Sequence, residues 1–246
     1  MLFPRLAVAM LAMSSILGAP AIASIETGKI LFLHRPNPPG GSADPAIVTH
    51  LEEMGYKVTS SDGLTNVPDP CGFDLVVMSS TVQSNRFTAD RAAIARWRDM
   101  GVPLLTWEND LLDDLRLTGR RIGSDFGEAE TGHYAWVVRA SHPMAGGVPA
   151  GMTTWTQARQ PAGWGKPGLG ADIVMVRPGE PDQAMLFGYE TGSTMDYDFV
   201  APARRVFIGL ENNTFGAMTE DGRHMFDGAI RWAAGGTRSC RHAHGS

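Results

Sequence analysis

Two apolar runs, far apart in the chain, end in the same way, with a glutamate followed by an asparagine. The polar residues after the runs 102–107 and 205–210 are Glu108, Asn109 and Asp110, and Glu211, Asn212 and Asn213. Two neighbouring carboxyl groups push their pKa values apart, so that one can donate a proton while the other accepts one. Asparagine amides both donate and accept hydrogen bonds, as a hydroxyl-rich ligand requires. The pattern predicts a site for a small polar molecule, such as a sugar.

Three further polar residues are candidates for the same site. His34 ends the run 29–34, Ser80 follows the run 73–79, and His142 precedes a proline on a loop. Ligands of open α/β sheets bind beyond the carboxyl ends of the strands. We expect catalysis by Glu108, Glu211 and His34, which could also hold a divalent metal together. The expected ligand-binding residues are Ser80, Asn109, Asp110, His142, Asn212 and Asn213.

The same residues have plain structural interpretations, which the sequence leaves open. Glu108 and Asn109 could cap the next helix, and Glu211 could pair with a nearby arginine. His142 could be a turn residue that its proline neighbour fixes. The sequence indicates no particular cofactor, substrate or oligomeric state.

Strands and helices alternate in the pattern of apolar residues. Apolar runs without alternation are typical of parallel strands that are buried on both faces. Strands are expected at 29–34, 56–59, 73–79, 102–107 and 205–210. Helices are expected from a cap at Asp44, from a cap at Thr88, from Asn109 or Asp110 to 115, and from Asp221. This order predicts a flavodoxin-like, doubly wound, mainly parallel α/β sheet with helices on both faces.

The segment 119–190 is rich in glycine and proline and has a different pattern. Short strands are expected at 134–138, 153–156, 173–176 and 184–189, as an antiparallel extension or edge of the sheet. Gly163, Gly165 and Gly168 match the letters of a dinucleotide-binding motif. The motif is rejected because no strand is expected before it, Pro167 interrupts it and no helix follows.

Composition and the N-terminal segment predict an exported globular protein. The net charge of −5 offers no basic surface for a nucleic acid backbone. Arg5, the apolar run 6–17 and the small residues at 21–23 are typical of a secretory signal peptide. We expect cleavage near Ala23, a single domain over 24–246, a periplasmic or secreted location and no membrane contact after signal removal. In that compartment Cys71 and Cys240 either form a disulfide or remain two free thiols.

Several short motifs extend over nearly the whole mature chain. They are ILFLH at 30–34, LEEMGYKV at 51–58, FDLVV at 73–77, MGVPLL at 100–105, HP at 142–143, RRVF at 204–207 and IRWA at 230–233. Their order resembles the ThuA-like (trehalose-utilisation) branch of the class I glutamine amidotransferase-like superfamily. The resemblance implies a flavodoxin-like domain with its site at the strand ends.

The chain departs from that family where the reaction would take place. Glutamine amidotransferases place a nucleophilic cysteine after a central strand and a His-Glu pair after a later one. Here Glu108 and Asn109 stand at the first position, and Glu211 stands at the second without a histidine. Glutamine hydrolysis by a thiolate therefore has no nucleophile. We expect a non-thiol hydrolase or related enzyme for a carbohydrate or another polyhydroxylated molecule; the alternative is a non-catalytic binding or accessory protein on the same scaffold.

Overall fold

The computed structural model describes residues 28–240. The expected signal peptide and its cleavage site lie outside the described residues. Across 28–240, no helix combines the length and the apolar character that a bilayer crossing needs.

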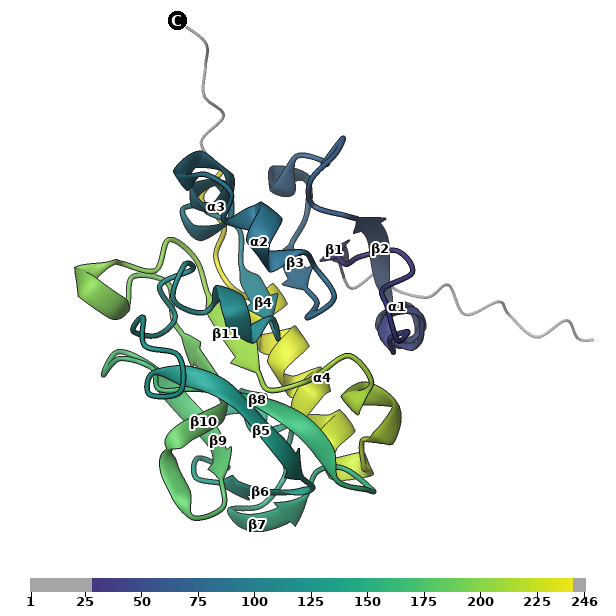
Figure 1. The fold of residues 1–246 in the computed structure, drawn as a ribbon, viewed down its shortest axis with the longest axis vertical. Helices are drawn as coiled ribbons and strands as arrows, with labels where there is room; N and C mark the ends of the chain where they lie inside the picture. The colour runs from purple at the N-terminus through teal and green to yellow at the C-terminus, as the bar shows by residue number, and fades with distance from the viewer. Residues whose placement is uncertain (1–27, 241–246) are drawn as a thin grey trace, which may run out of the picture.

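Parallel strands form one half of the sheet, in the order β2-β1-β3-β4-β11. Their bounds are Gly28–Leu33 for β1, Tyr56–Ser61 for β2, Leu75–Met78 for β3, Leu104–Thr106 for β4 and Arg205–Ile208 for β11. This is the strand order of flavodoxin-like sheets. Within β1, Ile30 and Phe32 pack into one core, and Leu31 and Leu33 into the other. The predicted fold class is confirmed (Figure 1).

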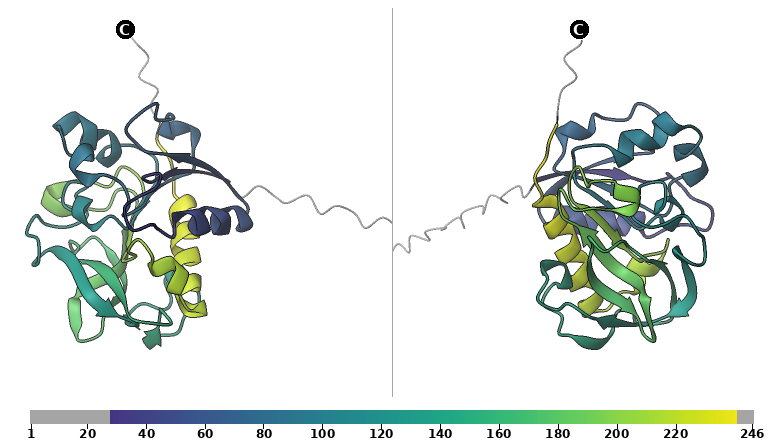
Figure 2. Two further views of the ribbon diagram at one scale, coloured as in Figure 1. Left: turned by 45° about the vertical axis from the view of Figure 1, so that its right-hand side comes forward. Right: turned by 90° about the vertical axis from the view of Figure 1, so that its left-hand side faces the viewer.

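Helices cover both faces of this half, as Figures 1 and 2 show. On one face lie α1 (Asp44–Glu53) and α4 (Glu220–Ala234), whose apolar side chains share one core. On the other face lie α2 (Ser84–Phe87) and α3 (Arg91–Arg98). Single 3-10 turns connect the elements at Pro70–Gly72 (η1), Asn109–Leu111 (η2), Pro143–Ala145 (η3), Asp196–Asp198 (η4) and Thr214–Ala217 (η5).

Two expected helix caps are wrong. The N-cap of α1 is Ala43, and the buried carboxylate of Asp44 instead accepts hydrogen bonds from Ser79 Oγ and Thr81 Oγ1, both at 2.7 Å. Thr88 ends α2, and α3 starts later because Asp90 accepts a 2.7 Å hydrogen bond from the Ala93 amide. A charged side-chain cap at Asp90 is stronger than a hydroxyl cap at Thr88, so the segment forms two helices.

The other half of the sheet is antiparallel. Beyond β11 follow β10 (Glu180–Tyr189), β9 (Asp172–Arg177), β6 (Tyr134–Val137) and β7 (Gly151–Thr154). These are the four strands that the sequence predicts for this region. Two unexpected strands, β5 (Phe126–Gly132) and β8 (Gln160–Gly165), pair with each other, and β8 also pairs with β10. The rejected glycine motif thus starts inside a strand.

The C-terminal segment is fastened to the parallel half. Cys71 and Cys240 form a disulfide with their Cα atoms 5.7 Å apart. Beside it, the Ser239 amide donates a 2.8 Å hydrogen bond to the Gly101 carbonyl, and Arg238 pairs with Asp74 at 2.9 Å. Of the two alternatives for the cysteines, the structure has the disulfide.

Candidate functional site

Glu108 and Glu211 lie at the same rim of the sheet. The strands that precede them, β4 and β11, are parallel neighbours, with Leu104 beside Arg205 and Thr106 beside Phe207. Their carboxyl ends therefore meet, as the strand-end rule requires. Burial is the main cause that raises the pKa of Glu108, and the charges of Asp110 and then Glu211 add to it.

Glu108 is a buried, neutral group at neutral pH. Its side chain is only 4% exposed, and burial raises its pKa to about 9. Its Oε1 accepts a 3.1 Å hydrogen bond from the Asp110 amide, so Glu108 is the N-cap of η2. The expectation that Asn109 or Asp110 starts a helix reaching residue 115 is wrong, because this capping closes only a single 3-10 turn.

Glu211 has a carboxyl oxygen without a partner. Its backbone is held by Thr214, whose Oγ1 accepts a 3.0 Å hydrogen bond from the Glu211 amide. Its Oε1 is buried and has no hydrogen-bond partner among the described residues. Burial, and after it the charges of Glu128 and Asp110, raises the pKa of Glu211 to about 8. The arginine pairing considered for Glu211 is not found within residues 28–240.

Glu128 of β5 completes the group of carboxyl side chains, and sequence reasoning missed it. It stands directly opposite Gly163 of β8, and its Oε1 accepts a 3.3 Å hydrogen bond from Asn109 Nδ2. A Cβ on Gly163 would stand 3.5 Å from Glu211 Oε1 and 3.6 Å from Asn109 Cβ. Opposite residues of paired strands project to the same face. The side chain that Gly163 lacks therefore leaves space beside Glu211 on the face from which Glu128 projects.

Glu128 and Glu211 face one pocket of about 240 Å³. Its other lining residues are polar or small: Gln160, Pro161, Asn212, Asn213 and Thr214. The predicted ligand-binding residues Asn212 and Asn213 are thus in place. Glu108, Asn109 and Asp110 do not line this pocket, and act on it through Glu128 and through charge.

Ser80 holds the side chain of Asn212 at this rim and does not itself line the pocket. Its Oγ donates a 2.9 Å hydrogen bond to Asn212 Oδ1. The Asn212 carbonyl in turn accepts a 2.7 Å hydrogen bond from the Ala43 amide, just before α1. Asn212 is therefore fixed from two elements, β3 and α1, while it contributes to the pocket.

His34 is not brought to the two glutamates. It lines a different pocket of about 360 Å³, together with Ser60, Ser61 and Asp62. Its Nδ1 lies 3.7 Å from Asp44 Oδ2. The reason is topological, since β3 separates β1 from β4. His34 thus does not share the pocket of Glu128 and Glu211, and its role in catalysis stays a prediction.

His142 has the structural role that was considered for it. Its Nδ1 accepts a 3.2 Å hydrogen bond from the Met144 amide, which caps η3. Its ring packs edge-on against Trp232 of α4 at 5.1 Å, and burial lowers its pKa. It does not line the pocket of Glu128 and Glu211. The proline after it lies at the start of the same turn, and ligand binding by His142 stays a prediction.

A metal site finds no support in the side chains present. Among the described residues, no three or more His, Cys, Asp or Glu side chains are arranged so that they could hold a metal ion. The polar side chains that line the pocket of Glu128 and Glu211 are carboxyl groups, amides and the hydroxyl of Thr214.

Comparisons with known proteins concern the fold. The sequence matches no model of a protein family and none of the curated proteins. A GMP synthase component from Thermoplasma acidophilum is 13% identical, with 84% of this chain and 94% of that chain covered and a TM-score of 0.48. A protein from Parabacteroides merdae described as ThuA-like is 14% identical, with 88% of this chain and 92% of that chain covered and a TM-score of 0.47. A glutamine amidotransferase from Thermotoga maritima is 11% identical, with 83% of this chain and 80% of that chain covered and a TM-score of 0.46.

Proposed function

We propose that this protein is an exported hydrolase of a carbohydrate or another small polyhydroxylated molecule, with Glu211 and Glu128 as its acid and base. One observation carries the proposal. A buried carboxyl group without a partner, that of Glu211, faces a pocket that a second carboxyl group, that of Glu128, also lines. A perturbed pKa beside a polar pocket is the usual sign of a proton-transfer site.

The two groups divide the work of hydrolysis by their environments. Glu211, with its pKa raised to about 8, holds a proton at neutral pH and donates it to the leaving oxygen as the bond to that oxygen breaks. Glu128 accepts a proton from water, and the remaining hydroxide forms the new bond to the substrate. Proton exchange with solvent then restores both groups, so atoms and charges balance.

Glu108 acts as a positioning residue in this scheme. It caps η2, which carries Asn109, and Asn109 donates the hydrogen bond that orients Glu128. The substrate's hydroxyl groups meet the amides of Asn212, Asn213 and Gln160 at the rim of the pocket. These polar side chains fit a polyhydroxylated ligand better than an apolar one.

The test is a product screen with three matched variants. Wild-type protein is incubated with a panel of O-glycosides and sugar esters, and products are measured by mass spectrometry. Glu211→Gln and Glu128→Gln should each lose roughly a hundredfold or more in kcat, as expected on removing a general acid or base. Glu130→Gln changes an exposed neighbour on β5 that does not line the pocket, and should retain activity.

Two outcomes would contradict the proposed reaction. Equal activity in all three variants would remove the carboxyl pair from the mechanism. Ligand binding by calorimetry with no product from any substrate would favour the alternative, a non-catalytic binding or accessory protein on this scaffold.

Export is tested separately, because it does not depend on the reaction. After expression of the full chain in a bacterial host, mass spectrometry of the periplasmic fraction should show a mature chain that starts at Ser24. The signal segment at 1–23 supports this proposal. A cytoplasmic protein that retains residues 1–23 would contradict it.

A further inference from the structure

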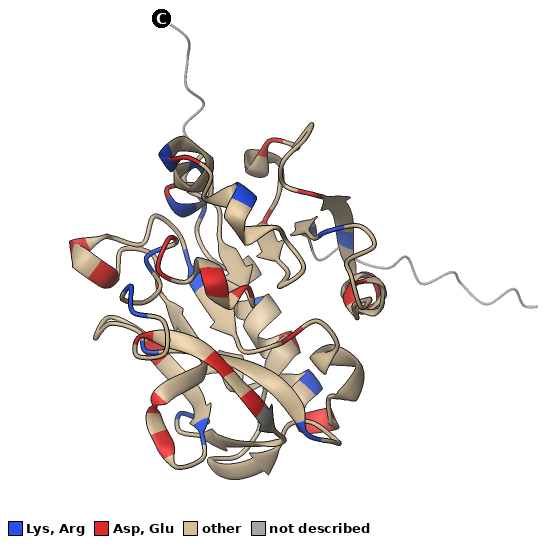
Figure 3. Cartoon of the chain, in the orientation of Figure 1, with Lys and Arg blue, Asp and Glu red and all other residues tan. Residues whose placement is uncertain are grey.

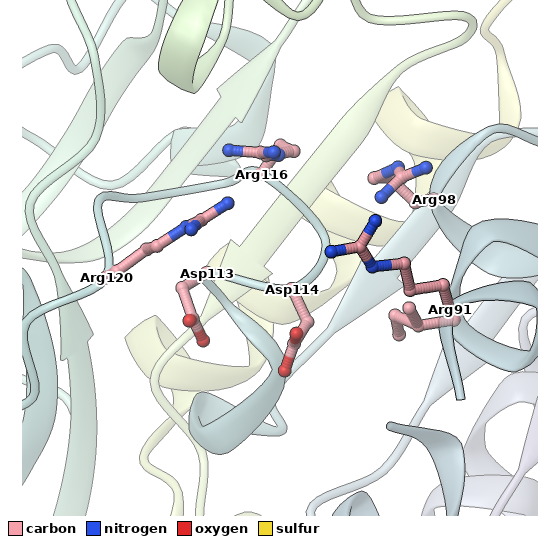
Figure 4. Close-up of a pocket in the computed structure, with 7 residues that line it drawn as sticks. Arg91, Arg98, Asp113, Asp114, Arg116 and Arg120 are labelled. Carbon is pink, nitrogen blue, oxygen red and sulfur yellow. The ribbon is translucent and has the colours of Figure 1, made fainter. Parts of the chain in front are cut away.

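A second pocket, of about 570 Å³, lies between α3 and the segment after η2. Its charged lining residues are Arg91, Arg98, Arg116, Arg120, Asp113 and Asp114. Figure 4 shows Arg91 and Arg120 extending toward each other from opposite sides, with Arg116 and Asp114 between them. Figure 3 shows basic residues gathered on α3, although the whole chain carries a net charge of −5. None of these residues lines the pocket of Glu128 and Glu211.

The charges that face this pocket do not pair across it. Within the described part of the chain, Arg91, Arg120, Asp113 and Asp114 form no ion pair, and Arg120 only lies 5.8 Å from the ring of Tyr197. The two arginines that are paired use partners outside the pocket: Arg98 pairs with Asp99 at 2.6 Å and Arg116 with Asp196 at 3.5 Å. Burial raises the pKa of Asp114, and the charges of Arg120, Arg116 and Arg98 lower it, so the pocket charges act on one another at a distance. Among residues 28–240, no close contact occupies the Asp114 carboxylate or the guanidinium groups of Arg91 and Arg120, which leaves these groups able to bind a ligand.

The backbone at this pocket is held in an unusual conformation. Arg116 has a φ of 63°, in the left-handed region that non-glycine residues rarely adopt. Its amide donates a 3.0 Å hydrogen bond to the Asp113 carbonyl, which closes a turn on the pocket's edge. Such strain persists only where the surroundings fix it, and it is frequent at ligand sites.

We propose that this pocket binds a small organic oxyanion that carries hydroxyl groups: a sugar phosphate, a sugar sulfate or a sugar acid. Guanidinium groups bind the oxygens of such anions through paired, charge-assisted hydrogen bonds. The carboxylates of Asp113 and Asp114 repel a bare anion but accept hydrogen bonds from hydroxyl groups. A ligand that offers both features satisfies the whole lining, so the site selects a charged sugar over both a neutral sugar and a bare inorganic anion.

Calorimetry with matched ligands tests this site. Glucose 6-phosphate, glucose 6-sulfate and glucuronate are compared with glucose and inorganic phosphate. The wild-type protein should bind at least one of the three anionic sugars more tightly than it binds glucose or inorganic phosphate, and the tightest one identifies the anion.

The double variant Arg91→Gln/Arg120→Gln should weaken that binding by roughly tenfold or more, since each arginine contributes charged hydrogen bonds. Arg86→Gln removes an exposed arginine outside the pocket and should leave the affinity unchanged.

A second variant gives a change of opposite sign. Asp114→Asn removes a repelling charge, so inorganic phosphate should bind several-fold more tightly than it binds wild type. Loss of folded protein cannot produce that gain. No binding of any anionic sugar at millimolar concentration, equal weakening in Arg86→Gln, or no gain in Asp114→Asn would overturn the proposal. Because the carboxylate pocket is not involved, this result is independent of the proposed hydrolysis.

Discussion

Gly163 determines how much space the carboxyl groups share. A methyl group there would stand 3.1 Å from Cζ of Phe207 and 3.5 Å from Glu211 Oε1. The first distance is tight for a side-chain carbon, and the second would press an apolar group against an unpartnered oxygen. A side chain at Gly163 would therefore crowd Phe207 and contact the carboxyl of Glu211.

Gly163→Ala should lower the stability of the protein and raise the pKa of Glu211 further. Overpacking costs about 1–3 kcal/mol, and the added methyl group would place more apolar surface against the buried carboxyl. Thermal unfolding and carboxyl titration by NMR measure the two effects. Gly132→Ala is the control, because a Cβ at Gly132 of β5 meets nothing within 4 Å. If Gly132→Ala changed the stability and the pKa of Glu211 as much as Gly163→Ala does, crowding at Gly163 would not be the cause.

At the level of elements, the parallel half of the sheet could be predicted and part of the antiparallel half could not. Strands β1, β3, β4 and β11 are short apolar runs that only a sheet buried on both faces explains. The small residues Gly127 and Ala129, which alternate with Glu128 and Glu130, are a period-two signal for β5, but a weak one. Strand β8 contains a proline and two glycines, and glycine weakens strand propensity. Both strands form because they pair with each other.

The same limits decide which site residues could be found. Glu108 and Glu211 were predictable because each follows an apolar strand, and neighbouring parallel strands end at one rim. Glu128 was not, because it belongs to a strand that only tertiary pairing reveals. His34 also follows a strand, yet strand order cannot be read from one sequence, and the order places β3 between it and Glu108.

The disulfide that holds the C-terminal segment should make a large contribution to the stability of the protein. It joins Cys71 of η1 to Cys240 of the C-terminal segment, across a sequence separation of 169 residues. The double variant Cys71→Ser/Cys240→Ser should lower the free energy of unfolding by about 2–5 kcal/mol, measured by urea denaturation. The hydrogen bond of Ser239 and the ion pair of Arg238 would remain, but both are near the surface and weak. An unchanged denaturation midpoint would show that these contacts suffice without the bridge.

For the whole molecule, the site lies where the parallel and antiparallel halves meet. Glu108 and Glu211 come from the parallel half, and Glu128 comes from the β5–β8 pair that β10 connects to the sheet. Figure 2 shows the two halves with α4 along one face. Joining the halves buries acidic groups at this junction, which makes the stability of the fold depend on pH.

Stability should fall as pH rises from about 4.5 to about 9. In the unfolded chain Glu108 and Glu211 ionise near their ordinary value of 4.5, whereas in the folded protein they hold their protons up to about 9 and about 8. The folded state therefore binds more protons in this window, and rising pH favours unfolding. From these two residues we expect a loss of at least about 2 kcal/mol in the free energy of unfolding.

Urea denaturation across this pH range measures the effect. The double variant Glu108→Gln/Glu211→Gln should have a flatter pH profile, and Glu130→Gln should have the same profile as wild type. Stability that rose with pH over this window, or a double variant as steep as wild type, would contradict the burial of two protonated carboxyl groups.

The most direct test of the proposed acid and base pair is the titration of Glu211 itself. NMR of protein labelled with ¹³C at the glutamate carboxyls, with the signal assigned by Glu211→Gln, gives its pKa. We predict a value near 8 in the wild-type protein and a lower one in Glu128→Gln, because the charge of Glu128 contributes to the rise. A pKa near 4.5, or one that Glu128→Gln leaves unchanged, would show that the two carboxyl groups do not form an acid and base pair.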